Sequence, residues 1–97
     1  MRLRWTRRAA ADLSRIAARI AADNRLAATE FSLAVRARAE RLKQFALLGR
    51  PGALDDTREL IVYRNYILTY RLREDEVQVL QLWHVARNLP RARPPRE

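Results

Sequence analysis

The sequence predicts an α+β domain in which an N-terminal helical hairpin packs on a small, mainly antiparallel sheet, in the order β-α-α-β-β-β. Two observations lead to this fold class. Apolar residues recur at helical spacing through the first half of the 97-residue chain, and three segments rich in β-branched and aromatic residues follow one another in the second half. Because alanine dominates both helices, their few large apolar side chains need a sheet to pack against.

The first strand and the first helix are predicted from the N-terminal 24 residues. Residues 2–5 alternate polar and apolar side chains, which is the period of a short strand. Thr6 then has the chemistry of an N-cap, and a helix is predicted over residues 7–22. Asn24 is expected to end this helix in the left-handed conformation that asparagine tolerates.

Two faces of this first helix can be separated by their side chains. The apolar face is formed by Leu13, Ile16, Ala17 and Ile20. A charged face carries Arg8, Asp12, Arg15 and Arg19, on which Asp12 and Arg15 are three residues apart and are expected to pair weakly.

A second helix is predicted over residues 26–45. Its apolar stripe consists of Phe31, Ala34, Val35, Leu42 and Phe45. Arg38 falls within this stripe, so its side chain is expected either to extend to the solvent at the edge or to meet a partner. Since only two or three polar residues separate the two helices, they must lie antiparallel.

Three strands are predicted after the turn residues 49–52, at 57–62, 66–71 and 77–83, and their short polar connections make an antiparallel meander. The aromatic residues Trp5, Tyr66, Tyr70 and Trp83 are interpreted as core rather than as surfaces for stacking on bases. Residues 1–90 are expected to form one domain. Residues 91–97 are a basic, proline-rich tail that is expected to be mobile.

The composition limits the classes of protein that fit. The formal net charge is +9, carried almost entirely by arginine, so nucleic acid, an acidic protein or an anionic surface could bind. The alternative is that the arginines only solvate helix faces. There is no cysteine, no apolar run approaches the roughly 20 residues of a membrane span, and the N-terminus does not resemble a signal peptide. We therefore expect a cytoplasmic protein with no membrane association, no metal and no cofactor.

Several short strings, in order along residues 3–90, carry a resemblance to a known family. They are Trp5-Thr6 with Ala9, Asp12, Leu13 and Ile16; Asn24 with Ala27-Ala28; Gly49-Arg50 with Gly52 and Thr57-Arg58-Glu59-Leu60; Tyr66-Ile67-Leu68-Thr69-Tyr70-Arg71; and Trp83-His84-Val85-Ala86-Arg87. Together they resemble the ParE-like toxins of the RelE/ParE toxin–antitoxin superfamily. One departure is Asp55-Asp56, which stands where this family often has a glycine and makes the loop less permissive.

The resemblance implies the toxin of a type II toxin–antitoxin system of the plasmid-stabilisation kind, which inhibits growth. ParE-like toxins act by binding DNA gyrase, without chemistry of their own. The implied partner is a ribbon-helix-helix, ParD-like antitoxin whose acidic segment folds as it binds the toxin and whose other half binds operator DNA, so that the toxin meets the operator only indirectly. Two alternatives stay open: a RelE-like, ribosome-dependent mRNA endoribonuclease, and an inactive relative that acts as co-repressor.

The candidate site residues follow from these alternatives. A ribonuclease needs proton-transfer groups and cations beside the reacting phosphate, for which the chain offers His84, Arg58, Arg71 and Arg87. No second proton-transfer group is evident, and a lone histidine does not make a metal site. The alternative is that His84 has only a structural role and forms a hydrogen bond with neighbouring backbone. Binding to antitoxin or target is assigned to the same three arginines together with Arg38, whose surroundings the sequence does not reveal.

Overall fold

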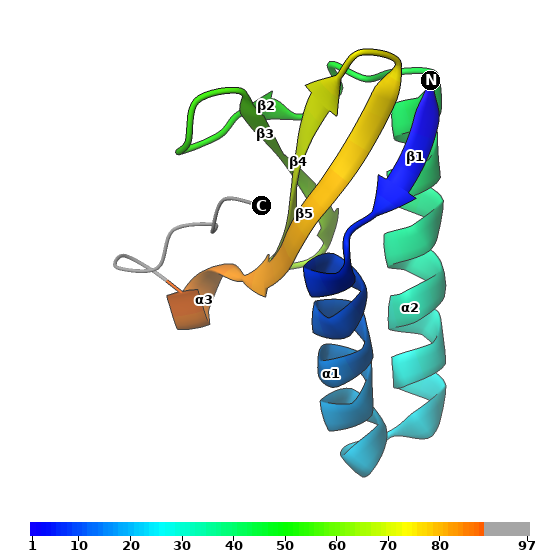
Figure 1. The fold of residues 1–97 in the computed structure, drawn as a ribbon. Helices are drawn as coiled ribbons and strands as arrows, with labels where there is room; N and C mark the ends of the chain where they lie inside the picture. The colour runs from blue at the N-terminus through cyan, green and yellow to red at the C-terminus, as the bar shows by residue number, and fades with distance from the viewer. Residues whose placement is uncertain (89–97) are drawn as a thin grey trace.

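The computed structural model of the chain describes residues 1–88, with the backbone alone at residues 87 and 88. The predicted tail at 91–97 lies outside the described residues. Two helices, α1 (Arg7–Asp23) and α2 (Arg25–Glu40), stand side by side as an antiparallel hairpin next to one sheet (Figure 1). A short 3-10 helix, η1 (Arg41–Lys43), follows α2, and α3 (Val85–Asn88) ends the described chain. The predicted helical hairpin is confirmed.

The sheet has five strands in the order β1-β5-β4-β3-β2. Their bounds are β1 (Arg2–Trp5), β2 (Arg50–Pro51), β3 (Thr57–Tyr63), β4 (Tyr66–Arg73) and β5 (Glu76–His84). The pairs β2–β3, β3–β4 and β4–β5 are antiparallel, and β1 lies parallel to β5. The predicted α+β class and element order are therefore confirmed, with the two-residue strand β2 added at one edge of the sheet.

Thr6 joins β1, α1 and β5. Its Oγ1 atom accepts a hydrogen bond from the amide of Ala9 at 3.2 Å, as an N-cap does, and its hydroxyl donates to the carbonyl of Val79 at 2.8 Å. The side chain is almost completely buried. The capping residue thus fixes where α1 leaves the edge of the sheet, and this position decides which part of β5 the helix covers.

Asn24 does not adopt the predicted left-handed conformation, because it serves both helices. Its φ is −156°, which is extended backbone, and its amide donates to the carbonyl of Ile20 at 2.9 Å. Its Oδ1 atom accepts from the amide of Ala27 at 3.0 Å and caps the N-terminus of α2. With a single residue between the helices, an extended residue that caps the second helix reverses the chain. Asn24 therefore ends α1 as predicted, but the predicted left-handed conformation was wrong.

The second helix is shorter than predicted. Its apolar stripe is confirmed as far as Leu42, which is fully buried together with Phe31 and Val35. The α-helix ends at Glu40, however, and Phe45, predicted to continue the stripe, is 52% exposed. The chain must leave the helix axis here because it crosses to β2, and Phe45 lies instead under the guanidinium of Arg41 at 5.4 Å from its ring centroid.

The main core lies between the helices and the sheet. The sheet contributes apolar residues of one face, namely Leu60, Val62, Leu68, Tyr70, Val77, Val79 and Leu82. Trp83 is buried as predicted but lies on the other face, since it alternates with Leu82 along β5, and its Nε1 donates to Oγ1 of Thr69 at 2.9 Å. A bulge between Thr69 and Tyr70 shifts the register of β4 against β5.

Asp55 and Asp56, which depart from the family pattern, lie in the loop before β3. Asp56 has φ 68°, in the left-handed region that glycine adopts without strain. Its carboxylate lies 3.8 Å from a guanidinium nitrogen of Arg73, and Thr57 beside it donates its hydroxyl to the carbonyl of Leu54 at 2.6 Å. The turn therefore keeps a glycine-like backbone with an aspartate in place, which aspartate tolerates better than most side chains.

Candidate functional site

Arg58 and Arg71 stand on neighbouring strands but face opposite sides of the sheet. Arg58 pairs in register with Tyr70, whereas Arg71 pairs with Thr57, and adjacent residues of a strand alternate between faces. The two guanidinium groups therefore do not converge on one point. The ribonuclease hypothesis needs a single cationic site built from both side chains. These strands do not bring the two side chains together in that way.

Arg58 holds the loop between η1 and β2. One of its guanidinium nitrogens donates to the carbonyl of Gly49 at 2.7 Å. Tyr70 on the same face receives a hydrogen bond from the Gly49 amide at 2.9 Å and donates its hydroxyl to the carbonyl of Ala46 at 2.8 Å. Burial raises the pKa of Tyr70, while the bond from Gly49 and the charge of Arg58 act in the opposite direction. Gly49, the glycine of the family-like Gly49-Arg50 string, is thus held in place by Arg58 and Tyr70. We call this set of hydrogen bonds the Gly49 latch.

Gly49 is required at this latch because no side chain fits. A Cβ atom there would lie 2.8 Å from the carbonyl oxygen of Glu59 and 2.8 Å from the ring of Tyr70. The first neighbour is backbone and the second is a completely buried ring, so neither can move aside easily.

Replacing Tyr70 with Phe is expected to lower the free energy of unfolding by about 1–3 kcal/mol, because the Gly49 amide loses its buried acceptor and Ala46 loses a donor. Urea unfolding followed by circular dichroism measures this effect. Tyr63→Phe is the matched control, since Tyr63 lies on β3 and is only partly buried. Equal stability of the Tyr70 and Tyr63 variants would contradict the latch.

The stability of the fold is also expected to fall at alkaline pH. Burial raises the pKa values of Tyr66 and Tyr70 above the usual 10.0, so the unfolded chain loses these protons before the folded chain does. The stabilisation is complete below pH 10 and is lost as the pH rises through the folded-state values. Melting temperatures measured between pH 8 and 11 should decline, and the Tyr70→Phe variant should decline less steeply.

Arg71 belongs to a polar row across β4 and β5. Its Nε donates to Oε1 of Gln78 at 2.8 Å, and Nε2 of Gln78 donates to Glu76 at 2.8 Å. The bond from Gln78, together with Arg4 and Arg2, lowers the pKa of Glu76. Arg71 is therefore hydrogen-bonded to the neighbouring strand β5.

His84, the last residue of β5, is oriented by neighbouring atoms. Its Nδ1 accepts a hydrogen bond from the amide of Ala86 at 3.1 Å. Its ring packs edge-on against Tyr66, with 4.8 Å between the centroids and 83° between the planes. This geometry matches the backbone-bonded alternative considered for this histidine.

Arg38 and Arg87 occupy separate places. The Nε of Arg38 donates to the carbonyl of Ile61 at 3.3 Å, so its side chain links α2 to β3. Arg87 lies in α3, and its side chain is outside the described structure. The structure therefore distributes the sequence-predicted residues over several surfaces.

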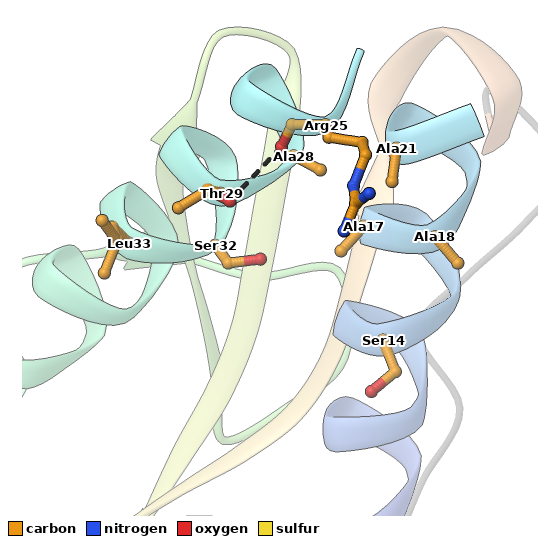
Figure 2. A pocket seen from close by; sticks show the side chains of 9 residues that line it. All are labelled: Ser14, Ala17, Ala18, Ala21, Arg25, Ala28, Thr29, Ser32 and Leu33. Carbon is orange, nitrogen blue, oxygen red and sulfur yellow. Dashed lines mark hydrogen bonds between the residues drawn. The ribbon is translucent and has the colours of Figure 1, made fainter. Parts of the chain in front are cut away.

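A groove between the two helices was not predicted as a site. It has a volume of about 550 Å³ and runs along the outer side of the hairpin (Figure 2). Its lining is formed by Ser14, Ala17, Ala18, Ala21, Arg25, Ala28, Thr29, Ser32 and Leu33. Figure 2 shows Arg25 reaching back over the alanines of α1, and Leu33, 64% exposed, at the other end. The high alanine content of both helices was the feature of the sequence that could have indicated this groove, because small side chains leave space between two neighbouring helices.

The burial of Asp12 and its contact with β5 are the second feature that was not predicted from the sequence. Asp12 is 2% exposed, accepts hydrogen bonds from Arg8 and Arg15 and also accepts the amide of Leu82 at 3.1 Å. The distance from Arg15 to Asp12 is 2.7 Å, so the predicted pair is confirmed, but as part of a buried link between α1 and β5. This link fixes Arg8 and Arg15 on one side of α1.

Residues 1–88 also lack the features of two other classes of site. No helix in this part of the chain is long and apolar enough to cross a bilayer. Within the same residues, no three metal-ligating side chains of the usual kinds come together.

The arrangement of a helical hairpin on a five-stranded mixed sheet defines the structural class. A chain of the solved chromosomal ParDE toxin–antitoxin system from P. aeruginosa shares this fold with a TM-score of 0.80 and 29% sequence identity, over 88% of the present chain and 96% of that chain. A family model described as the ParE toxin of the type II toxin–antitoxin system parDE matches residues 3–89. The protein therefore belongs to the ParE toxin family.

Two relatives with toxin names support the same assignment. The putative toxin Y4kP of Sinorhizobium fredii is 34% identical over 90 residues, which cover 92% of this chain and 93% of the relative. Toxin RelE2 of Caulobacter vibrioides is 34% identical over 83 residues, which cover 86% and 93% respectively. The motif series recognised in the sequence thus marks a toxin of a type II toxin–antitoxin system.

Proposed function

We propose that this toxin inhibits growth in the cytoplasm by binding DNA gyrase and that a ParD-like antitoxin neutralises it. In this proposal the toxin stabilises the cleaved state of gyrase-bound DNA and contributes no chemistry of its own. The ParDE name of the solved relative and the ParE description of the matching family support the pairing with such an antitoxin.

The observation that favours binding over catalysis is the separation of the candidate catalytic groups. Arg58 and Arg71 face opposite sides of the sheet, and each donates to a neighbouring group of the fold. His84 accepts from the amide of Ala86 through Nδ1, which removes one of its two ring nitrogens from proton transfer. Cleavage of RNA by its 2′-hydroxyl needs a base, an acid and cations within hydrogen-bond reach of one phosphate, and these side chains do not supply that arrangement.

The positive charge and the exposed apolar side chains of the protein favour a partner that is both acidic and amphipathic. The chain carries a net charge of +9, and several large apolar side chains are exposed: Leu26, Leu33, Phe45, Leu47, Leu48 and Ile61. A segment that folds on binding can cover such side chains and place carboxylates beside the arginines. Both properties fit the antitoxin that the proposal requires.

Supercoiling of relaxed plasmid by purified gyrase tests the proposed target. Added toxin should block supercoiling and accumulate double-strand cleaved DNA, and prior mixing with the antitoxin should restore the reaction. A parallel reaction contains programmed ribosomes and intact mRNA. Cutting of that mRNA while gyrase stays unaffected would refute the gyrase proposal and favour the ribonuclease alternative, to which the RelE2 relative gives some weight.

Replacing His84 with Ala is expected to leave gyrase inhibition within about twofold of the unchanged toxin. The reason is that the ring makes an edge contact with Tyr66 and a local bond to Ala86, neither of which requires chemistry. Inhibition titrations with folded protein, checked by circular dichroism, measure this. A folded variant with at least 100-fold weaker toxicity would point to proton transfer, for which removal of the group typically costs 10²–10⁴-fold in rate.

A further inference from the structure

A small basic pocket lies where α1 runs past the end of β5. The pairing of strand β1 with β5 ends at the Trp5–Val79 pair, after which Thr6 turns the chain into α1. The end of β5 therefore has a helix, not a strand, beside it. The pocket between them has a volume of about 90 Å³, which suits one small polyatomic group. We call it the arginine pocket; its lining is formed by Arg8, Arg15, Ile16, Arg19, Tyr66, Gln81, Leu82, Trp83 and His84.

Three guanidinium groups border the arginine pocket, and one carboxylate compensates them. Asp12 binds Arg8 at 3.1 Å and Arg15 at 2.7 Å, so both side chains are held in place before any ligand arrives. Arg19 lies one helical turn beyond Arg15 and makes no ion pair within residues 1–88. Because Asp12 offsets one of the three positive charges, the lining keeps an excess of two, which an anion can neutralise.

Gln81 adds a polar side chain to the lining of the arginine pocket. It lines the arginine pocket, is 6% exposed, and its Oε1 atom is buried without a hydrogen-bond partner among the described residues. Such an orphaned amide oxygen is uncommon in folded proteins and costs free energy unless something binds it. The Nε2 group of the same amide is a donor that can bind an oxygen of an anionic ligand.

We propose that the arginine pocket binds a single terminal phosphate group, as present in inorganic phosphate or in a phosphate monoester. A phosphate monoester carries a charge between −1.5 and −2 at pH 7, with a second pKa near 6, which matches the excess of two positive charges. Its oxygens accept from planar guanidinium forks and can also accept from the amide nitrogen of Gln81. A carboxylate carries only one negative charge. A phosphodiester inside a strand also carries one charge, and its flanking sugars exceed the pocket.

This site is separate from the proposed gyrase function, which assigns a role to none of the pocket residues; His84 is a candidate only in the ribonuclease alternative. The phosphate can come from inorganic phosphate or from the 5′ end of a nucleic-acid strand. Both sources present the same terminal group to Arg15, Arg19 and Gln81, and their affinities separate them.

Isothermal titration of the full chain tests the proposal with three probes: inorganic phosphate, a 5′-phosphorylated tetranucleotide and the same tetranucleotide with a 5′-hydroxyl. The phosphorylated probe should bind at least tenfold more tightly than the hydroxyl probe. Arg19→Gln should reduce phosphate binding at least tenfold, and Gln81→Leu should reduce it severalfold. Tighter binding of the tetranucleotide than of inorganic phosphate identifies a strand end as the source, and the reverse order identifies free phosphate; either order supports the proposal.

Arg25→Gln is the matched control, because it removes the same charge from the groove on the other side of α1 and leaves the arginine pocket unchanged. Arg19 makes no ion pair with any residue of the described part of the chain, so its variant should fold normally, as circular dichroism can verify. Equal loss of binding in the Arg19 and Arg25 variants would mean that net charge alone attracts phosphate. That result, equal affinities for the two tetranucleotides, or binding of succinate in preference to phosphate would each overturn the proposal.

Discussion

Replacing Asp12 with Ala is expected to lower the free energy of unfolding by about 3 kcal/mol. The carboxylate is 2% exposed and is the acceptor for the amide of Leu82, which would be left buried without a partner. Two arginines would also lose their shared counter-charge. Removing one partner of a buried ion pair costs about 3–5 kcal/mol, and the lower end applies because Arg8 and Arg15 are about half exposed and regain water.

Urea unfolding of the unchanged chain, Asp12→Ala and Asp23→Ala measures this effect. Asp23 is exposed at the end of the same helix, so its variant should differ by less than about 0.5 kcal/mol. Asp12→Asn should fall between the two, because its amide oxygen still accepts from Leu82 but no longer attracts the guanidinium groups. A loss below 1 kcal/mol in Asp12→Ala would show that the link between α1 and β5 contributes little.

Local patterns in the sequence were sufficient for most of the secondary structure. Helical spacing, strand alternation and the N-cap at Thr6 act within a few residues. They predicted the first helix and the strands, whereas the second helix ends at Glu40 and not at residue 45. Asp12 shows the limit of such patterns. Its pair with Arg15 spans three residues and was predicted, but the amide that makes it a buried link lies 70 residues away on β5. No local pattern specifies that contact.

The relation between Arg58 and Arg71 shows a second limit. Both were placed on neighbouring strands, as observed, but whether two strand residues share a face depends on the exact register of the pair. In the structure Arg58 lies opposite Tyr70 and Arg71 opposite Thr57. A shift of one residue would have reversed this relation, so the sequence supplied the residues of the candidate site but not their grouping.

The arginine pocket could be anticipated only in part. The charged face formed by Arg8, Asp12, Arg15 and Arg19 follows from helical spacing alone. What turns this face into a pocket is the end of β5, which brings Gln81 and His84 beside α1. That juxtaposition depends on the parallel pairing of β1 with β5, a contact between the two ends of the domain.

Replacing Phe31 with Ala is expected to lower the free energy of unfolding by about 4 kcal/mol, the largest effect of a single change considered. Phe31 is fully buried in the core between α2 and the sheet. Its ring meets Tyr63 and Tyr66 edge-on, with centroid distances of 5.3 Å and 4.9 Å. Truncating a buried phenylalanine costs about 3–5 kcal/mol through lost transfer free energy and an unfilled cavity.

Phe45→Ala is the matched control that the chain provides, since these are its two phenylalanines and both fall on the stripe predicted from helical spacing. Phe45 is 52% exposed because α2 ends before it, so its truncation should cost less than about 1 kcal/mol. Thermal and urea unfolding of both variants measure the difference. Equal losses would mean that the helix continues through residue 45 in solution, as the periodicity alone predicts. A fourfold or greater difference would instead place the end of the apolar stripe at Leu42, where the tertiary path of the chain overrides the local pattern.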